Sequence, residues 1–519
     1  MSIGLFAVIS VASLLTSPPN GKPSSLPTNQ AIECQDLMSA TWSGFKVSAA
    51  EDHEAEGGVP AYCLVRGVID DEIHFELVLP SPDAWNGRFV MGGGGGFVGT
   101  VENQLTWLAP DFLTRGFASI GTDTGHQGTA IDASWAMDRK DREINFGFRA
   151  VHLTAETAKT IIRLHYGQDI GYSYFIGCSR GGGQAMMESQ RFPDDFDGIV
   201  SGAPAYDWTG LAAQMVQTQQ AMYPNSSNLS APVVTPEVRQ LVSSVLLERC
   251  DAVDGLEDGI LSDPRDCDLE PGDLPRCPSG ETSETCLTEQ QFRAVEAVYG
   301  GAFSAGQRIY PGFPLGAEMD EGGWDTWITG NADLWGPGTP SLHFAFGTQI
   351  FKYLVFDDPD WDYLSYDFST WAADTRKAAG ILNATETDLT AFEISGGKLI
   401  LWNGWSDAAI TALGTIQYYE AVRQEHADAE SFARLFLLPG VGHCAGGSGP
   451  DQVDWLSAIQ AWVEEGKPPT RLVATKLGED GAVQVERPVC AYPARAQYTG
   501  AGDGTREGAF ECVAPSGGQ

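Results

Sequence analysis

Basic residues are scarce in this chain of 519 residues. Lysine and arginine together number 31, against 69 aspartates and glutamates, which gives a formal net charge of −38 at pH 7. A surface of this charge repels the phosphate backbone of nucleic acids and the headgroups of anionic membranes. The composition therefore argues against nucleic-acid and membrane partners. It favours solubility, but it identifies no substrate.

Long apolar runs are also lacking, with one exception near the N-terminus. Residues 3–15 form an apolar run that is too short for a membrane span, which needs about 20 residues, but suits the core of a signal peptide. No lysine or arginine precedes this run, and no clear cleavage motif follows it. We expect residues 1–20 to be a signal peptide, the protein to be secreted or periplasmic, and no other segment to cross a membrane.

Cysteine spacing of the kind that binds zinc is absent. None of the 10 cysteines belongs to a C-x-x-C pair, whereas an even number of cysteines agrees with an exported protein that contains disulfides. Pairing between neighbours in the sequence is the simplest arrangement. It predicts the bridges Cys34–Cys63, Cys250–Cys267, Cys277–Cys286 and Cys490–Cys512. Cys178 and Cys444 are then left without a partner nearby in the sequence.

The most informative stretch is residues 172–191. A strand-like run at 172–176 ends at Gly177, and a helix-like run begins near Ala185. Between them, residues 177–181 read Gly-Cys-Ser-Arg-Gly, which matches the G-x-S-x-G nucleophile turn in its strand–turn–helix context. A chain with 61 glycines matches such a pentapeptide easily by chance, so the context carries the prediction. It predicts that Ser179 is a nucleophile, and the alternative is a plain glycine turn.

Strand and helix patterns alternate on both sides of this stretch. Strand-like segments are expected at 73–79, 88–91, 116–120, 198–204, 398–402 and 433–438, and helices at 145–165, 409–423 and 453–465. The alternation stops from about residue 207 to about 390, where Trp, Gly, Pro, Asp and Cys are frequent. We therefore predict an α/β-hydrolase fold with a parallel sheet. Residues 21–206 and 391–519 would form the catalytic domain and 207–390 an inserted lid domain, with a loop-like tail from about residue 485.

A nucleophilic serine requires a general base and an acid that orients the base. In an α/β-hydrolase both follow the serine in the chain, the acid first, each on a loop after a strand. Asp407 and His443 occupy such positions after the last two predicted strands. Taken singly, Asp407 could be a helix cap and His443 a surface residue. Together with Ser179 they predict a catalytic triad.

A stabilised oxyanion needs two backbone N–H donors, one of them from the residue after the nucleophile. That residue is Arg180. The second donor is expected in the loop at residues 92–96, five consecutive glycines after an early strand, and Gly95 is the residue we select. A phosphate-binding loop is the alternative, but no Lys-Ser/Thr pair follows the glycines.

The two unassigned cysteines flank the predicted catalytic residues. Cys178 immediately precedes Ser179, and Cys444 immediately follows His443. If the serine and the histidine are hydrogen-bonded, the cysteines beside them are also close together. The two cysteines could then join.

With these motifs the chain resembles the tannase and feruloyl esterase family. The resemblance extends over nearly the whole mature chain. It rests on Gly177-Cys-Ser-Arg-Gly-Gly182, Gln190-Arg-Phe-Pro193, Asp197-Gly-Ile-Val-Ser-Gly-Ala-Pro204, Thr122-Asp-Thr-Gly-His126, Phe148-Arg-Ala-Val-His152, Asn403-Gly-Trp-Ser-Asp407 and Gly442-His-Cys444. It implies a carboxylic ester hydrolase with Ser179, Asp407 and His443 as the triad and a Cys178–Cys444 disulfide. Gly183 departs from the family, whose members often carry a larger residue there.

An acidic turn lies within the predicted lid. The carboxylates of Asp251, Asp254 and Asp258, in a stretch whose glycines permit a tight wrap, suit a hard cation that prefers oxygen ligands. The spacing is not that of an EF-hand, and a plain acidic turn is the alternative. The resemblance favours Ca²⁺, with the carbonyl oxygens of Leu256 and Ile260 as further ligands and a structural role for the ion.

These observations predict a secreted serine esterase of the feruloyl esterase type. The expected substrate is a small ester of an aromatic acid, free or attached to a polysaccharide or polyphenol. Hydrolysis of tannins or of a terephthalate monoester is the alternative within enzymes, and a silent binding protein is a third hypothesis. Aromatic residues of the lid are expected to line the acyl pocket or to form the core of the lid; they are Trp324, Trp327, Trp335, Phe344, Phe346 and Phe351. Asp123, His126, Arg149 and His152 are interpreted as structural.

Overall fold

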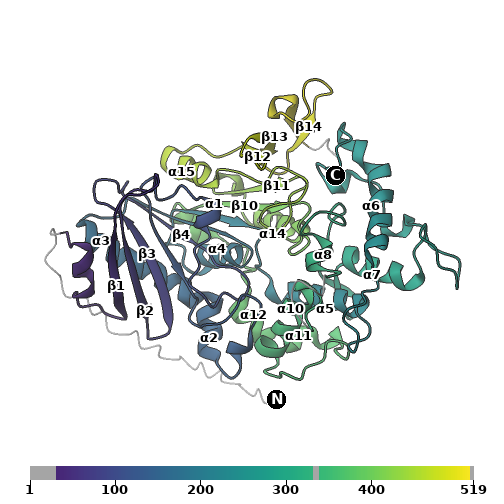
Figure 1. The fold of residues 1–519 in the computed structure, drawn as a ribbon, viewed down its shortest axis with the longest axis horizontal. Coiled ribbons are helices and arrows are strands. Elements are labelled where there is room, and N and C mark those ends of the chain that lie inside the picture. The colour runs from purple at the N-terminus through teal and green to yellow at the C-terminus, as the bar shows by residue number, and fades with distance from the viewer. Residues whose placement is uncertain (1–30, 331–337, 515–519) are drawn as a thin grey trace, which may run out of the picture.

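A nine-stranded sheet runs through the structure (Figure 1). The computed structural model describes residues 31–330 and 338–514. Along the sheet the strands follow the order β1-β2-β3-β5-β4-β6-β7-β10-β11. Their bounds are β1 Phe45–His53, β2 Tyr62–Ile69, β3 Ile73–Pro80, β4 Arg88–Gly92, β5 Ala118–Thr122, β6 Tyr172–Cys178, β7 Gly198–Gly202, β10 Lys398–Gly404 and β11 Ala433–Leu438.

The sheet has two parts that differ in strand direction. The strands β1, β2, β3 and β5 pair antiparallel, whereas every pairing from β5 through β4, β6, β7 and β10 to β11 is parallel. The parallel part is the α/β sheet that the sequence predicts. The sequence pattern does not predict β1, because most of its side chains are exposed or half-buried and an edge strand needs no regular apolar alternation.

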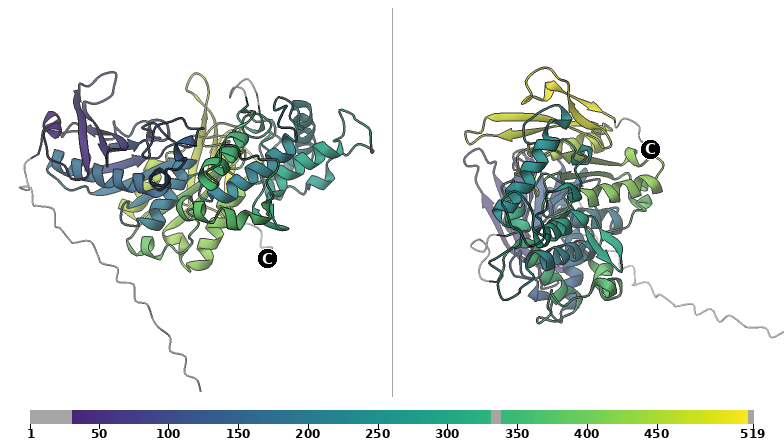
Figure 2. Two further views of the ribbon diagram at one scale, coloured as in Figure 1. Left: turned by 90° about the horizontal axis from the view of Figure 1, so that it is seen from below. Right: turned by 90° about the vertical axis from the view of Figure 1, so that its right-hand side faces the viewer.

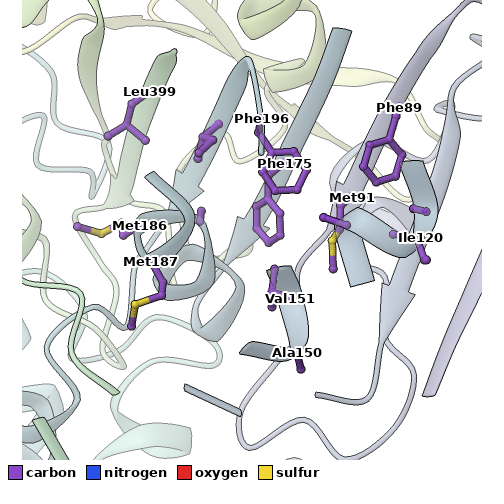
Figure 3. Close-up of a cluster of buried hydrophobic side chains, with 14 of the residues drawn as sticks. Phe89, Met91, Ile120, Ala150, Val151, Phe175, Met186, Met187, Phe196 and Leu399 are labelled. Atoms are coloured by element: carbon purple, nitrogen blue, oxygen red, sulfur yellow. The ribbon is translucent and has the colours of Figure 1, made fainter. Parts of the chain in front are cut away.

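Successive residues of a strand point to opposite faces of the sheet, and in the parallel part helices cover both of these faces. The helices outside the inserted segment are α1 Leu105–Leu108, α2 Lys140–Ile144, α3 Ala150–Tyr166, α4 Arg180–Arg191, α14 Ala412–Glu425 and α15 Trp455–Glu465. On one face Phe175 and Leu399 share an apolar cluster with α3, α4 and α14, part of which Figure 3 shows. On the other face Tyr174 and Ile400 pack with α1 and α15.

Two of the predicted helices differ most from expectation at their N-terminal ends. The helix expected at 145–165 begins with a π-helical turn, Asn145–Arg149, before α3. The helix expected at 409–423 starts only at Ala412, because the Thr411 side chain caps it by accepting a hydrogen bond from the Leu413 N–H.

A long segment whose regular elements are mostly helices joins β7 to β10. It contains α5 Trp208–Met222, α6 Pro236–Cys250, α7 Glu289–Gly300, α8 Trp324–Trp327, α10 Leu342–Gln349, α11 Trp371–Asp374, α12 Arg376–Leu382, α13 Thr390–Ile394 and the hairpin β8 Ala302–Ser304 with β9 Gln307–Tyr310. Most of these elements lie to one side of the sheet, in teal and green (Figure 1). Because β7 and β10 pair directly, from Gly198 opposite Lys398 to Gly202 opposite Trp402, the segment leaves the sheet uninterrupted.

The C-terminal tail contains strands, so the prediction of a loop-like tail is wrong. β12 Arg471–Leu477 pairs with β13 Val483–Cys490, and β14 Arg495–Tyr498 pairs with β15 Phe510–Val513. Pro488 within β13 argues against a strand in the sequence. A two-stranded ribbon tolerates it, because only one side of each strand needs hydrogen-bond partners. These strands lie at the top of Figure 1, and Figure 2 shows them from two further sides.

Five disulfides are present, and no cysteine is free. The pairs are Cys34–Cys63, Cys178–Cys444, Cys250–Cys267, Cys277–Cys286 and Cys490–Cys512. Disulfides in this number are typical of secreted proteins. Among the described residues, no helix combines the length and the apolar character needed to cross a bilayer. The predicted signal peptide, residues 1–20, lies outside the described residues.

Candidate active site

Ser179 occupies a sharp turn between β6 and α4. Its backbone has φ 64° and ψ −121°. Residues other than glycine rarely adopt this conformation, and where they do it is often at a functional site. Close packing explains the glycines of the motif: a Cβ on Gly177 would lie 2.5 Å from the backbone of Gly181, and one on Gly181 would lie 2.2 Å from Gln104 Oε1. The turn thus presents the serine at the carboxyl edge of the sheet.

The structure brings together the three residues predicted to form the triad. His443 Nε2 lies 2.9 Å from Ser179 Oγ, and His443 Nδ1 lies 2.9 Å from Asp407 Oδ2 and 3.1 Å from Asp407 Oδ1. The side chain of His443 is 11% exposed and that of Asp407 is fully buried. The serine comes from the turn after β6, the acid from the loop after β10 and the histidine from the loop after β11.

Backbone amides hold the Asp407 carboxylate in place. Its Oδ1 accepts hydrogen bonds from the N–H groups of Ala409 at 2.8 Å and Ile410 at 2.9 Å. The residues that follow Asp407 do not begin a helix, so the alternative interpretation of Asp407 as a simple helix cap does not apply. The carboxylate is therefore fixed in a position where it can accept the Nδ1–H of the histidine and stabilise an imidazolium.

A disulfide links the loops that carry the serine and the histidine. Cys178 and Cys444 are bonded across a sequence separation of 266 residues, beside Ser179 and His443. The bridge gives the two loops a covalent connection that the sheet alone does not provide. It restrains the distance between nucleophile and base.

The prediction of Gly95 as the second oxyanion donor is wrong in this structure. The Gly95 N–H donates to Glu102 Oε2 at 2.6 Å, so it already has a partner within the protein. Within the described residues the Gly96 N–H makes no hydrogen bond to the protein, and Gly96 lines the same pocket as Ser179. Arg180 is the first residue of α4, where the N–H has no partner within the helix.

The Arg180 side chain is fully enclosed beside the serine. Its Nη2 donates to the carbonyl oxygens of Phe146 and Gly147, and its guanidinium carbon lies 4.2 Å from the centroid of the Phe146 ring and 5.3 Å from that of Trp208. Burial lowers the pKa of Arg180 to about 9, which leaves the group charged at neutral pH. These contacts fix the side chain and with it the start of α4.

An apolar pocket opens beside Ser179 and His443. Its walls come from the loop after β4, from α4 and α5, from the inserted segment and from the Asp407 loop; the lining residues are Gly96, Ser179, Arg180, Ala205, Trp208, Leu211, Met215, Trp327, Phe346, Ile350, Ala409, Ile410 and His443. The ring of Trp327 meets that of His443 edge to face, with centroids 4.8 Å apart. The pocket suits an apolar or aromatic group attached to the reacting carbonyl.

Of the aromatic residues expected in the pocket, the structure places two there, Trp327 and Phe346. Trp324 is buried in one apolar cluster of the inserted segment, and Phe344 and Phe351 pack in another. Trp335 lies outside the described residues. No sequence pattern singles out Trp208, Leu211 or Met215, because apolar and polar side chains are mixed around their helix α5 and most of both kinds are buried.

Other polar residues near the motifs have structural contacts. His126 Nε2 lies 2.8 Å from the Phe97 carbonyl oxygen, and the ring stacks on Trp135; burial lowers the pKa of His126 to about 4. Asp123 accepts hydrogen bonds from the backbone N–H groups of His74 and Gly125. Arg149 pairs with Asp70, and His152 pairs with Asp195. All four agree with the structural interpretation.

The acidic turn at residues 251–260 folds back on itself. Asp251 Oδ1 accepts from the Gly259 N–H at 2.8 Å, Asp254 Oδ1 accepts from the Leu256 N–H at 3.0 Å, and Asp258 is paired with Arg487. The atoms that the turn offers as metal ligands are all oxygens, which suits Ca²⁺. However, the only group of three or more His, Cys, Asp or Glu side chains in the described residues whose ligand atoms all lie within 4.8 Å of one another consists of His152, Glu188 and Asp195. The three carboxylates of the turn must therefore move closer together to share one ion.

Known proteins resemble this chain over most of its length. The family model for tannase and feruloyl esterase matches residues 63–513. The chain is 34% identical to an uncharacterized esterase of Xanthomonas campestris pv. campestris, over 92% of this chain and 91% of the relative. It is 33% identical to the mono(2-hydroxyethyl) terephthalate hydrolase of Piscinibacter sakaiensis, over 90% of this chain and 87% of the relative. The crystal structure of feruloyl esterase B from Aspergillus oryzae aligns with a TM-score of 0.80 at 27% identity, covering 92% of this chain and 99% of that one.

The family match extends over both the motifs at the serine and those at the histidine, and the matching crystal structure has the same fold over 92% of this chain. This protein therefore belongs to the tannase and feruloyl esterase family and is a carboxylic ester hydrolase with an α/β-hydrolase fold.

Proposed function

We propose that this protein is a serine esterase that hydrolyses esters of aromatic carboxylic acids, in the manner of a feruloyl esterase. The observation that carries the proposal is the hydrogen-bonded chain from Ser179 Oγ through His443 to Asp407, at the mouth of an apolar pocket. The substrate is a small aromatic ester, free or attached to a polysaccharide or polyphenol. The strongly acidic surface is compatible with such uncharged partners.

The proposed reaction passes through an acyl-enzyme. His443 Nε2 takes the proton from Ser179 Oγ while that oxygen attacks the ester carbonyl carbon. The tetrahedral intermediate collapses, and the alcohol leaves with the proton that His443 returns. Water then attacks the acyl-enzyme, again with His443 as base, and the carboxylic acid is released. Asp407 keeps the histidine in the tautomer that accepts the serine proton.

The carbonyl oxygen becomes negatively charged in this reaction and needs hydrogen-bond donors. We assign this role to the backbone N–H groups of Arg180 and Gly96. The first lies at the start of α4, where the helix dipole also favours negative charge. The second is supported by the absence of a protein partner for the Gly96 N–H among the described residues and by its position in the pocket wall.

The pocket suits more than one aromatic acyl group. Ferulate, gallate and terephthalate all carry an aromatic ring that suits a pocket walled by Trp208, Trp327 and Phe346. The names of two similar proteins, feruloyl esterase B and mono(2-hydroxyethyl) terephthalate hydrolase, support the first and the last of these acids. We place ferulate first, with tannin esters and terephthalate monoesters as the alternatives.

A panel of esters tests the proposed substrate class. It contains methyl ferulate, methyl caffeate, methyl gallate, mono(2-hydroxyethyl) terephthalate and the small activated ester 4-nitrophenyl acetate. Burial of an aromatic ring contributes about 1.5–3 kcal/mol, so after correction for leaving-group reactivity we expect kcat/KM to be about ten- to a hundredfold higher for one aromatic ester. Cleavage of the acetate alone would contradict the assignment of the pocket. If folded protein cleaves none of them, the silent binding protein becomes the better explanation.

We also propose that residues 1–20 are removed as a signal peptide on export. The five disulfides support this proposal, because such bonds form outside the reducing cytoplasm. N-terminal sequencing of protein from the culture medium or periplasm tests it. An intact N-terminus on protein that remains in the cytoplasm would contradict it.

We further propose that the turn at residues 251–260 binds a structural Ca²⁺ through the carboxylates of Asp251, Asp254 and Asp258 and the carbonyl oxygens of Leu256 and Ile260. The oxygen donors and the left-handed φ values of Gly255 (95°) and Gly259 (77°) support a tight wrap. An ion here would bridge the carboxylates without taking part in the reaction.

Chelation is expected to lower the melting temperature of the protein. A ligand at a hundred times its Kd stabilises the folded state by about 2.7 kcal/mol, which corresponds to a decrease of a few degrees in a chain of this length. We expect added Ca²⁺ to restore the melting temperature of wild type but not of Asp251→Asn. Mg²⁺ is the control ion. Protein that contains no calcium by metal analysis and melts at the same temperature with and without chelator would contradict the proposal.

A further inference from the structure

Glu102 contacts the glycine-rich loop that carries the proposed oxyanion donor. It is half-buried and lies between that loop and α1. Its Oε2 accepts a hydrogen bond from the Gly95 N–H at 2.6 Å, and its Oε1 lies 3.4 Å from Thr100 Oγ1. No lysine, arginine or histidine among the described residues forms an ion pair with it. The backbone of the loop is thus the principal partner of this carboxylate.

The backbone of Glu102 is itself fixed to the central sheet. Its N–H donates to the Thr122 carbonyl oxygen at 3.3 Å, and the Thr122 N–H donates back to the Glu102 carbonyl oxygen at 3.2 Å. The approach is so close that a Cβ on Gly121 would lie 2.1 Å from Glu102 O. Glu102 therefore reaches the loop from a rigid base at the end of β5.

The loop needs such support because it consists of glycines. A run of five glycines has many backbone conformations of similar energy, whereas an oxyanion hole works only when its donors are held in place before the reaction. The Gly93 N–H donates to the Ile176 carbonyl oxygen, and the Gly94 N–H donates to Gln184 Oε1. These two contacts fix the start of the loop, and Glu102 fixes the next residue.

The residue after this contact is Gly96, the proposed donor. Its φ is +51°, and a Cβ there would lie 2.2 Å from the Ala130 carbonyl oxygen, so its conformation is restricted to glycine. The Phe97 N–H donates to the same Ala130 oxygen at 2.8 Å. The loop is therefore held on both sides of Gly96, by Glu102 before it and by Ala130 after it, while the Gly96 N–H itself stays without a protein partner in the described part of the chain.

We propose that Glu102 is a positioning residue for the oxyanion hole: its side-chain oxygen holds the Gly95 N–H so that the next N–H, that of Gly96, faces the reacting carbonyl. This inference rests on the proposed triad mechanism. Glu102 is not among the residues that line the pocket, so it acts through the loop and does not touch the substrate. A hydrogen bond to a carboxylate is stronger than one to a neutral acceptor, which suits a loop whose glycines leave its backbone conformation weakly determined.

Three substitutions separate this role from a merely structural one. Glu102→Gln keeps an oxygen at the same distance from the backbone, Glu102→Asp withdraws it by one methylene, and Glu102→Ala removes it. We expect kcat on an aromatic ester to fall about 10- to 100-fold in the Ala and Asp variants, below the loss of about 10²–10³ seen when an oxyanion donor is removed outright. The Gln variant is expected to stay within about fivefold of wild type, because its amide oxygen still accepts from Gly95. KM is expected to change less than about threefold in all of them.

Affinity for a boronic acid provides the readout that a structural role would not change. An aryl boronic acid adds to the serine as a tetrahedral anion and so resembles the intermediate, whereas the product acid does not. We expect the inhibition constant of the boronic acid to rise in the Ala and Asp variants by the same factor as kcat falls, with product binding unchanged. Glu56→Ala, which removes an exposed carboxylate elsewhere, is the matched control and should leave both values as in wild type.

Each outcome decides the question. A lower melting temperature in Glu102→Ala with unchanged kcat and boronic acid affinity overturns the proposal, as does an Asp variant that is as active as the Gln variant. If the Ala variant does not fold, the comparison of Asp with Gln still tests the distance dependence. Failure of the triad mechanism looks different: wild type would then cleave no ester, and a fluorophosphonate probe would not label Ser179.

Discussion

Replacement of Ser179 by alanine is expected to lower kcat on any ester by about 10⁴- to 10⁶-fold. The Ser179 oxygen attacks the carbonyl carbon and forms the covalent intermediate, and in the described structure it is the hydroxyl bonded to His443 Nε2. Alanine removes the nucleophile but leaves the pocket and the oxyanion donors. The remaining rate would come from water attack in the same site, so KM is expected to change little.

Initial rates and active-site labelling together measure this effect. A fluorophosphonate probe should label wild type and fail to label Ser179→Ala. Ser189→Ala on the same helix is the matched control. Among the described residues the Ser189 hydroxyl bonds to the Met186 carbonyl oxygen of α4 alone, and Ser189 is not among the residues that line the pocket. A Ser179→Ala variant that retains more than about a tenth of the wild-type kcat would show that another nucleophile carries the reaction.

Replacement of Asp407 by asparagine is expected to lower kcat by about 10⁴-fold. Asparagine matches aspartate in size, so the loop after β10 should keep its shape. Oδ1 is held by the N–H groups of Ala409 and Ile410, so the amide nitrogen of asparagine would take the Oδ2 position that faces His443 Nδ1. Two donors cannot face each other, and the histidine would therefore carry its proton on Nε2. In that tautomer it cannot accept the proton of Ser179.

The pH dependence of kcat distinguishes a wrong tautomer from a misfolded site. At high pH, hydroxide can remove the proton of Ser179 in place of the histidine, so Asp407→Asn should regain part of its activity as the pH rises. Its melting temperature should stay close to that of wild type. Asp454→Asn is the control, because Asp454 caps α15 at the surface by accepting from the Ser457 N–H at 2.9 Å. An Asp407→Asn variant within about tenfold of wild type at neutral pH would contradict the assigned role.

Local patterns were sufficient to predict the positions of the proposed catalytic residues. The turn around Ser179 has a sequence signature because a sharp strand–helix turn excludes side chains at Gly177 and Gly181. Asp407 and His443 follow strands whose apolar runs are readable, and parallel strands bring their carboxyl ends to one edge of the sheet. The same logic predicted that the neighbours of the serine and histidine lie close together, as the Cys178–Cys444 bridge shows.

Periodicity failed where the side chains of a strand are not buried in a regular pattern or where a proline interrupts the strand. Most side chains of β1, at the edge of the sheet, are exposed or half-buried, and β13 contains Pro488. Neither strand therefore has the apolar pattern of a central strand. Composition likewise did not separate Trp327 and Phe346, which line the pocket, from Trp324 and Phe351, which form the core of the inserted segment. Aromatic residues serve both purposes, and only their neighbours in space differ.

The sequence by itself determined the α/β sheet, the family and the three residues of the proposed triad, because each depends on short-range turn chemistry and on the order of strands along the chain. The tertiary structure decided which backbone N–H is available to an oxyanion. Five adjacent glycines are equivalent in a sequence, but Glu102 occupies the N–H of Gly95 and Ala130 restricts Gly96. Which of these N–H groups has a partner depends on hydrogen bonds between segments that meet only when the chain has folded. A local sequence pattern therefore does not predict it.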